Sequence, residues 1–484
     1  MKKVDLMHDV IIVGGGPVGL MLALELSLAN VDPLVLEGSA AIDPTIKAGS
    51  LNGPAADTLR RRGVEFAAAA PGGAPRFIGH VAGMPIRADR VRWERLEGSS
   101  DTAFVSQQQI QELAEERLAE RGVEVRRGIR VMEVVPHDDR VSVVTDAGKL
   151  EASWVVGADG GRSLVRKSAG FAFPGLDGIM TGYQMLVQGT GLDDIPIGWH
   201  TTATGVFRRM PNNLILTAEF DGAPADRSAQ ITLDDLTGAI RRVTGVDATV
   251  TAALSATRFT DNTRVVDSYR RGRVLLAGDA AHVHPPFGGQ GLSLGMLDAT
   301  ALGWRLAGVI GGRLPERVFD DYERERRPEA ERILEWSRAQ VALMRTDERS
   351  RAAGRLVRSL METPDGATEV ARVVAGGVVS YAAGDSPIGT FAADWAGADA
   401  DGGSLFDVAA DGFAVLAHRR NAEPPASLDG RVRAFATDDG PAPFVLVRPD
   451  GVIAWAGAEA SGDEFAQALS GLGLVTALHA VPTR

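Results

Sequence analysis

The chain has 484 residues, enough for roughly two to four domains, and it is 45% hydrophobic and 24% charged, a globular composition that argues against global disorder. Its 51 basic and 63 acidic residues give a net charge of −12, which argues against a general nucleic-acid or anionic-membrane partner. The absence of cysteine excludes disulfides, thiolate metal sites and dithiol redox chemistry in this chain, and it fits a cytoplasmic location.

The N-terminal segment has the pattern of a β-α-β unit. Val10–Val13 is a compact β-branched run that predicts a buried parallel strand, Leu20–Leu28 predicts a helix, and Pro33–Glu37 predicts a second strand. The apolar run from Val10 to Leu24 is too short and too rich in glycine to cross a bilayer, so we expect no membrane segment here.

The next segments alternate between helical and β-type patterns. Ala67–Pro75 is rich in Ala, Gly and Pro and predicts a surface loop, and Gln108–Arg121 predicts a charged amphipathic helix. Runs of β-type residues are most frequent from about 180 to 265, which predicts a second, sheet-based domain. Strands are predicted at Val123–Arg127, Val141–Thr145, Trp154–Val156, Leu214–Phe220 and Val274–Ala277.

The last third of the chain begins with a charged stretch. Glu316–Ser350 is dense in Glu and Arg at helical spacing, which predicts one long solvated helix with i,i+4 ion pairs. Gly397–Ser404 predicts a linker, and a compact unit of roughly 80 residues follows it. Strands of that unit are predicted at Ala414–Ala417, Phe444–Val447 and Val452–Trp455, with a turn at Pro449–Gly451.

Three glycines follow the first predicted strand in the spacing Gly14-x-Gly16-x-x-Gly19. The first permits a tight turn, the second lets backbone approach a pyrophosphate, and the third lets the helix pack on the strand. The helix N-terminus offers free N–H groups to the phosphates, and Glu37, about 20 residues on, can bind ribose hydroxyls. This order of elements predicts a dinucleotide site; a glycine-rich turn without a ligand is the alternative.

Two later segments each run from a strand into a glycine and an acid. Val155–Asp159 enters a glycine turn, which alone could be a loop with an Asx-type bond. A strand ending at Gly278-Asp279 is followed by the glycine-rich Pro285–Gly291 and a helix of small and apolar residues from about Leu292 to Ala307. The acid can bond a ribitol or ribose hydroxyl, and the helix N-terminus can face the electron-rich pyrimidine edge of a flavin.

With these motifs the sequence resembles the single-component FAD-dependent aromatic hydroxylases of the para-hydroxybenzoate hydroxylase class, and among them the polyketide hydroxylases. The resemblance covers nearly the whole chain, from Val10–Gly14 through Gly157–Gly160 and Gly278-Asp279 to Pro449–Ala456. It implies an α/β fold with a Rossmann-like FAD-binding domain, an interleaved β-sheet substrate domain and a redox-inert, thioredoxin-like C-terminal domain. The implied bounds are 1–178 and 265–390 for the FAD-binding domain, with an excursion near 75–104 into the middle domain, 179–264 for the substrate domain, and 391–484 for the C-terminal domain.

The resemblance also assigns roles to individual residues. The implied FAD contacts are Gly14, Gly16, Pro17, Val18 and Gly19 at the pyrophosphate, Glu37 at the adenosine ribose, Gln107, Val131 at adenine, Asp159 in a turn that serves FAD and NADPH, Gly278 and Asp279 at the ribityl chain, Pro286 and Gly289 beside the isoalloxazine, and Gly289, Gly291, Leu292 and Ser293 at its pyrimidine edge. No catalytic side chain stands out, because the flavin carries the chemistry.

The sequence departs from the family pattern at two places. Lys47 stands where members usually carry an arginine near the FAD phosphates, and lysine keeps the charge but loses the forked geometry. Leu292-Ser293 replaces a common Met-Asn pair, where the contact is largely made by backbone, so we expect little change there.

Several residues have more than one interpretation. Candidates for substrate contact are Tyr183, Met185 and Phe287, with sheet packing as the alternative for the first two. His282 and His284 invite a metal interpretation, but no third ligand stands at suitable spacing, so we expect no metal. We expect His282 to pack by the flavin or to bond backbone, and Asp298 to be either a solvated helix-face acid or functional.

The resemblance implies a monooxygenase that uses FAD, NADPH (or NADH) and molecular oxygen to hydroxylate a polycyclic aromatic, polyketide-type phenol through a flavin hydroperoxide. The single GxGxxG agrees, since this class binds NADPH transiently without a second Rossmann domain. Baeyer–Villiger insertion, antibiotic inactivation and a non-catalytic flavin-binding scaffold stay open as alternatives. The implied partner is a small aromatic substrate, not nucleic acid or membrane, and a homodimer is allowed.

Overall fold

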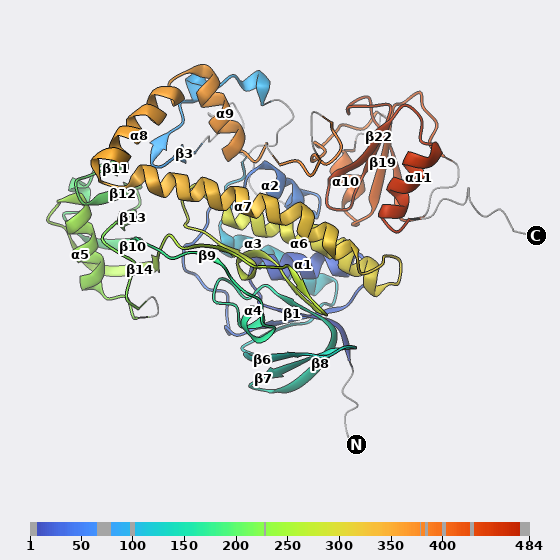
Figure 1. Ribbon diagram of the computed structural model, residues 1–484, viewed down its shortest axis with the longest axis horizontal. Coiled ribbons are helices and arrows are strands. Elements are labelled where there is room, and N and C mark those ends of the chain that lie inside the picture. The colour runs from blue at the N-terminus through green and yellow to red at the C-terminus, as the bar shows by residue number, and fades with distance from the viewer. Residues whose placement is uncertain are drawn as a thin grey trace, which may run out of the picture.

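The computed structural model describes residues 7–64, 79–96, 102–226, 229–377, 379–382, 386–398, 403–425 and 430–474. A long helix, α7 (Val318–Met344), passes a lower α/β part, an antiparallel sheet at one end and a C-terminal unit near the other (Figure 1). The loop predicted at Ala67–Pro75 lies outside the described residues.

The α/β part is built on an eight-stranded sheet. Its main path runs β16 (Arg270–Arg271), β17 (Val274–Leu276), β8 (Gly148–Gly157), β1 (His8–Val13), β2 (Pro33–Glu37) and β5 (Val125–Arg127), while β6 (Val131–Pro136) and β7 (Val141–Thr145) extend from β8. The strands from β17 to β5 are parallel to one another. Parallel strands are buried on both faces, which explains why the buried part of β1, Val10–Val13, and all of β17 are continuous apolar runs.

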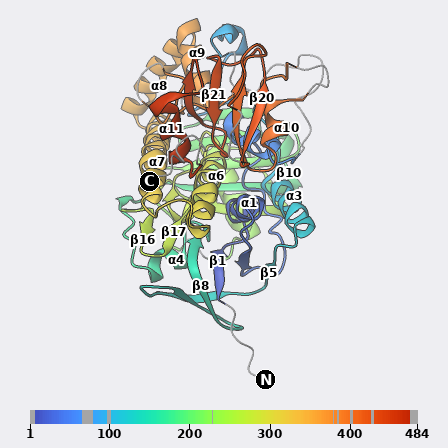
Figure 2. The same cartoon turned by 90° about the vertical axis from the view of Figure 1, so that its right-hand side faces the viewer.

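Three helices lie side by side over this sheet: α1 (Pro17–Leu28), α3 (Gln107–Glu120) and α6 (Gly291–Ile310) (Figure 2). The middle one, α1, is almost wholly buried, and apart from the buried Glu25 and Ser27 it is apolar rather than amphipathic. Among the helices in the described ranges, α6 included, none is long and apolar enough to cross a membrane.

A second, five-stranded antiparallel sheet follows the order β11 (Gly198–Thr201), β12 (Gly205–Arg209), β13 (Leu214–Glu219), β10 (Thr181–Thr190) and β14 (Thr249–Phe259). One face packs on the amphipathic helix α5 (Leu233–Thr244), which begins with a capping box between Thr232 and Asp235 and ends at Gly245. Short pairs complete this region: β3 (His80–Val81) with β4 (Met84–Pro85), and β15 (Thr263–Val265) between β9 (Gly175–Leu176) and β18 (His282–Val283).

The prediction of one long solvated helix over Glu316–Ser350 is wrong in two respects. The helix ends at Met344, and α8 (Glu348–Met361) begins after the cap Asp347, followed by α9 (Pro364–Val374). Along α7 one face is buried, and it includes the charged Arg326. Charge density alone predicted solvent exposure, but a buried partner elsewhere in the chain neutralises this arginine.

The C-terminal unit holds a sheet in the order β20 (Val432–Ala436), β19 (Ala414–His418), β21 (Phe444–Val447) and β22 (Ile453–Gly457), with α10 (Leu405–Ala409) and α11 (Gly462–Gly471). The linker predicted at Gly397–Ser404 does not separate it from the rest. Phe391 already pairs with Val452 in the unit, and Ala396 pairs with Ser404, so the chain on both sides of the predicted linker contacts the unit or its own flank; residues 399–402 of that prediction lie outside the described residues.

Candidate active site

The glycine loop after β1 is held by close backbone contacts. Gly14 has a φ of 114°, and a Cβ there would lie 2.3 Å from the carbonyl oxygen of Ala158. A Cβ on Gly19 would lie 1.9 Å from the carbonyl oxygen of Gly14. A Cβ on Gly16, by contrast, would meet nothing within 4 Å. The first and third glycines are therefore required by the fold, and the second leaves the backbone open toward a ligand.

Three separated motifs meet at Val18, in the first turn of α1. A Cβ on Gly278, after β17, would lie 3.0 Å from Val18 Cγ2, and one on Gly295 in α6 would lie 2.7 Å from the same atom. Gly14 in turn touches Ala158 at the end of β8. The ends of β1, β8 and β17 and the first turns of α1 and α6 therefore form one place in the molecule.

Both of these helices begin without a side-chain cap. Gly16 precedes α1 and Gln290 precedes α6, and neither first turn contains an acidic residue. The first N–H groups of a helix need acceptors, and the helix dipole favours an anion. Two such ends beside an open glycine backbone fit a pyrophosphate and an electron-rich ring, as a flavin dinucleotide would supply.

Glu37 ends β2 beside the glycine loop. Its Oε2 accepts a hydrogen bond from the Gly15 N–H and its Oε1 accepts one from the Ser39 N–H, both at 2.8 Å. Arg127, at the end of the adjacent strand β5, donates to the Gly15 carbonyl at 3.3 Å. Sequence reasoning missed Arg127; its place at the end of a parallel strand was the available signal.

Asp159 caps the short helix α4 (Leu164–Ser168). Its Oδ2 accepts from the N–H of Leu164 at 2.7 Å and of Val165 at 3.1 Å, so the local Asx-type alternative describes one of its oxygens. Its Oδ1 is buried with no hydrogen-bond partner in the described part of the chain, and burial raises the pKa of this carboxyl. This oxygen is therefore an acceptor that the turn itself does not use.

Asp279 has no such internal role. Gly278 turns the chain at a φ of 61°, and the carboxyl group of Asp279 is exposed in the short turn that follows. No hydrogen bond to this carboxyl group is found among the described residues. A carboxylate at the end of β17 is thus free to accept a bond from a polyol hydroxyl.

The structure excludes one of the two alternatives left open for Asp298 and one of the two for His282. Asp298 is not a solvated acid: it is fully buried, and its Oδ2 accepts from His282 Nε2 at 2.7 Å and from the Gly278 N–H at 3.0 Å. Arg326 Nε donates to its Oδ1 at 2.7 Å. Burial alone would raise the pKa of Asp298, but Arg326 and His282 outweigh it and hold the pKa below its ordinary value. His282 therefore bonds a carboxylate rather than backbone.

The loop between β18 and α6 carries Pro286, Phe287 and Gly289. Gly289 has a φ of 65°, and a Cβ there would meet nothing nearer than Ser50 Oγ at 3.9 Å. Phe287 is buried, with its ring edge-on to Phe259 of β14 at 6.1 Å between centroids. The loop therefore has an open side at Gly289 and an anchored side at Phe287.

His284 lies in the same loop. Its Nδ1 donates to the Pro285 carbonyl at 2.8 Å, while its Nε2 is buried without a partner in the described chain and lies 3.0 Å from the Cβ that Gly291 would carry. Burial lowers the pKa of His284, so the ring is neutral near pH 7. Among the described residues no group of three or more His, Asp or Glu side chains could hold a metal ion.

Three of the remaining predicted FAD contacts, Lys47, Gln107 and Ser293, lie in or contact the segment from residue 46 to 52. Lys47 is exposed and pairs with Asp43 at 2.9 Å. The N–H of Gln107, the first residue of α3, donates to Ala48 O at 3.2 Å. The hydroxyl of Ser293 accepts from the Asn52 N–H at 3.0 Å, so it fixes this segment against α6. The other members of the set lie at the start of α1 (Pro17), the start of β6 (Val131) and the first turn of α6 (Leu292).

Tyr183 and Met185 do not face the site. Both side chains lie in the core between the middle sheet and α5, and Arg258 Nε donates to the Tyr183 hydroxyl at 3.1 Å. Gln184, on the other face of β10, donates instead to Ile46 O at 3.0 Å. Alternate strand residues point to opposite faces, so sequence position alone could not say which face the site uses.

An aromatic group that sequence reasoning missed lies on that other face. It packs with Phe287 and consists of Trp93, Trp199, Phe220, Phe259 and Trp336. Nearby, the ring of His80 lies 4.4 Å from that of Trp199, and burial, with the charge of Arg208, lowers the pKa of His80 to about 4. The signal in the sequence was weak, because these residues are scattered over more than 240 positions of the chain.

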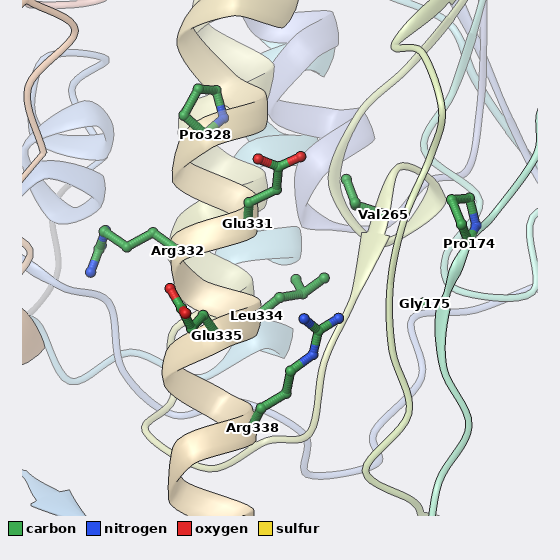
Figure 3. A pocket seen from close by; sticks show the side chains of 9 residues that line it. All are labelled: Pro174, Gly175, Val265, Pro328, Glu331, Arg332, Leu334, Glu335 and Arg338. Carbon is green, nitrogen blue, oxygen red and sulfur yellow. The ribbon is translucent and has the colours of Figure 1, made fainter.

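A groove outside this region opens between α7 and the segments that carry Gly175 and Val265 (Figure 3). Pro328, Leu334 and Arg338 lie on its helical side. None of the glycine or acid motifs lines it, so we regard it as separate from the site.

The fold and the site together define an FAD-binding oxidoreductase of the dinucleotide-fold class. Residues 7–337 match the family described as FAD binding domain. The chain is 35% identical to a rifampicin monooxygenase of Streptomyces venezuelae, with 93% of this chain and 96% of the relative covered. It is 35% identical to a dialkyldecalin synthase of Streptomyces rugosporus, with coverage of 92% and 95%.

A solved structure, the anhydrotetracycline hydroxylase OxyS from Streptomyces rimosus, superimposes with a TM-score of 0.83 at 32% identity, covering 96% of this chain and 99% of that one. The chain therefore belongs to the FAD-binding family of flavin monooxygenases, as the resemblance of its motifs predicted.

Proposed function

We propose that this protein uses FAD, a reduced nicotinamide cofactor and molecular oxygen to hydroxylate a polycyclic aromatic, polyketide-type phenol. The observation that carries the proposal is the convergence of Gly14, Val18, Gly278 and Gly295 at two uncapped helix ends. The names of the relatives, a rifampicin monooxygenase and an anhydrotetracycline hydroxylase, support a large aromatic substrate.

We assign the FAD contacts as the sequence predicted them. The backbone of Gly14–Gly19 and the first turn of α1 would hold the pyrophosphate, Glu37 the adenosine ribose and Asp279 the ribityl chain. The bound flavin supplies electron transfer and oxygen activation. The protein would position the flavin and exclude water from it. The first turn of α6 would stabilise negative charge on the flavin ring, and the buried Phe287 would exclude water on the substrate side.

We place the substrate between the open side of the Gly289 loop and the face of the middle sheet that carries Phe259. The aromatic group that packs with Phe287 lies there, and aromatic side chains pack edge-to-face or offset against planar rings such as those of a polycyclic phenol. This placement replaces Tyr183 and Met185 as substrate contacts and keeps Phe287.

We further propose that residues 1–178 and 265–390 form the FAD-binding domain, that 179–264, with the excursion near 75–104, form the substrate domain, and that 391–484 form a thioredoxin-like domain. The parallel pair β19–β20 beside the antiparallel hairpin β21–β22 supports the last assignment. A cytoplasmic location is part of the same proposal, which allows a homodimer.

A substrate panel tests the proposed reaction. Holoenzyme should oxidise NADPH slowly alone and at least about tenfold faster with a suitable polycyclic phenol, equivalent to about 1.4 kcal/mol of barrier. With isotopically labelled oxygen, mass spectrometry should find one labelled atom in the product, and the product's structure separates ring hydroxylation from Baeyer–Villiger insertion. Comparison of NADPH with NADH settles the reductant. The hydroxylase proposal fails when no phenol in a broad panel accelerates NADPH oxidation.

A second candidate function follows from the relative named dialkyldecalin synthase. A solved structure named as a Diels-Alderase is 32% identical to this chain, and a Diels–Alder cycloaddition needs no oxidant. On that alternative a yellow protein would convert a diene substrate without consuming NADPH or oxygen. Antibiotic inactivation remains a third outcome, and including rifampicin in the panel tests it, because one relative is named a rifampicin monooxygenase.

A further inference from the structure

A fully buried carboxylate spans the segment that carries Asp279. Asp298 Oδ2 accepts from the Gly278 N–H at 3.0 Å and from His282 Nε2 at 2.7 Å. These two contacts lie on either side of Asp279, whose own carboxyl group is exposed. The position of Asp279 is therefore set by a side chain of α6 and not by solvent-exposed loop residues.

Arg326 of α7 holds that carboxylate from the other side. Its Nε donates to Asp298 Oδ1 at 2.7 Å, and its Nη2 donates to Leu294 O at 3.0 Å, in the first turns of α6. Its third contact is the Tyr381 hydroxyl, at 2.7 Å from Nη1. One buried guanidinium thus fixes Asp298 and the beginning of α6 together.

The adjacent residue on α7 binds the C-terminal unit. The carboxylate of Glu325 accepts hydrogen bonds from both terminal nitrogens of Arg448, at 2.8 and 2.9 Å. Arg448 also donates to the carboxylate of Asp450 at 2.6 Å. Trp304 of α6 donates to Asp450 at 3.1 Å. The turn between β21 and β22 therefore contacts α6 and α7 at once, through buried polar groups.

Buried charges of this kind are an inefficient way to gain stability. Desolvating them costs as much as their attraction returns, and apolar replacements are often neutral or stabilising. Their directional bonds do fix the relative position of the elements that carry them. Here those elements are α6, whose first turn faces the flavin site, and α7, which carries Arg326.

We propose that Asp298 and Arg326 are positioning residues of the FAD site, and that the C-terminal unit acts on the same site through the turn Arg448–Gly451. The C-terminal unit fixes α6 relative to α7 through Arg448 and Asp450. Arg326 fixes the carboxylate of Asp298, and Asp298 fixes the residues on either side of Asp279. The proposal goes beyond the proposed reaction, because it rests only on FAD binding, which membership of the family shows.

The test compares FAD affinity with stability in three single variants of the full chain. Tyr381→Phe removes one hydroxyl and no charge, Asp450→Asn removes one buried charge, and Asp321→Asn removes an exposed charge on α7 as the matched control. Titration of apoprotein with FAD, followed by quenching of flavin fluorescence, should show a dissociation constant raised at least about threefold in the first two variants and unchanged in the third.

A double-variant cycle with Asp279→Ala separates positioning from general weakening. When the network acts through Asp279, the fold-loss of Tyr381→Phe should largely vanish in the Asp279→Ala background, since contacts in one network do not add. Fully additive losses would overturn the proposal, and so would wild-type FAD affinity in both Tyr381→Phe and Asp450→Asn, even with a lowered melting temperature. Loss of NADPH oxidation with unchanged FAD affinity would contradict the proposed reaction instead.

Discussion

At the scale of single residues, Asp279 is the clearest of the proposed FAD contacts. Its carboxyl group is exposed at the end of β17, and no hydrogen bond to it is found in the described part of the chain. By contrast, Glu37 and Asp159 already accept backbone hydrogen bonds that hold the local fold. Replacement of Asp279 should therefore affect the ligand more than the protein.

Asp279→Ala should weaken FAD binding by about 1.5–3 kcal/mol, roughly ten- to a hundredfold, because a charge-assisted hydrogen bond is lost. Flavin occupancy of the purified variant and titration of its apoprotein measure the effect. The exposed Asp32→Ala serves as control and should keep its flavin. Unchanged occupancy in Asp279→Ala would show that this carboxylate is not a ligand contact.

Substitution by alanine should affect the stability of the apoprotein differently at two glycines of the same loop. Gly14→Ala places a Cβ 2.3 Å from Ala158 O at a φ of 114°, so we expect destabilisation by about 2 kcal/mol or more even without FAD. Gly16→Ala meets no protein atom within 4 Å and should leave apoprotein stability within about 0.5 kcal/mol while lowering FAD affinity. Thermal melts of both apoproteins test this, and equal melting temperatures would contradict it.

At the scale of elements, the loop between β18 and α6 combines a left-handed backbone with an open side. Gly288 and Gly289 have φ values of 88° and 65°, which L side chains rarely adopt, and the position beside Gly289 is open. The resemblance to the aromatic hydroxylases implies a flavin ring that swings between an outer position for reduction and an inner one beside the substrate. A simple helix-capping loop is the competing description.

Gly289→Val should slow flavin reduction by NADPH and raise hydrogen peroxide release, because a β-branched side chain strains this backbone and crowds the open side. Peroxide formed per NADPH consumed is the measurement. Gly289→Asn tolerates the left-handed conformation better and separates the strain of the backbone from crowding of the site. Wild-type coupling in the valine variant would mean that the loop only caps α6.

At the scale of the whole molecule, buried ion pairs join the C-terminal unit to the α/β part and make stability depend on acid. Burial alone would raise the pKa of Asp450, but Arg448 outweighs it and lowers the pKa to about 2. A folded-state pKa below the unfolded value contributes stability that is full above the unfolded pKa and is lost as pH falls through the folded one. Asp298 has the same direction of shift.

The melting temperature should therefore fall from about pH 4 toward pH 2, and the fall should be shallower in Asp450→Asn, which cannot take up that proton. Calorimetry of the apoprotein across this range measures the difference. The exposed Asp321→Asn, with its partner Arg324 also exposed, should follow the wild-type curve. Parallel curves for Asp450→Asn and wild type would contradict the assignment.

Local signals determined much of this molecule. A β-branched run followed by closely spaced glycines and an apolar helix predicted β1, the loop and α1, and β2 begins and ends where the sequence predicted, because these patterns depend on neighbours a few residues apart. The motifs also identified the family, which the comparisons confirmed.

Only the tertiary structure decided which side chains are buried and with whom. Arg326 looked solvated because its neighbours along α7 are charged, and Asp298 looked ambiguous, but each is the other's partner across 28 positions of the chain. For Tyr183 and Met185 the sequence left substrate contact and sheet packing open, and the structure places both in the core against α5, because period-2 alternation does not say which face a helix will cover. Sequence determines local conformation and composition, whereas burial and the pairing of charges arise from contacts between residues that are distant in the chain.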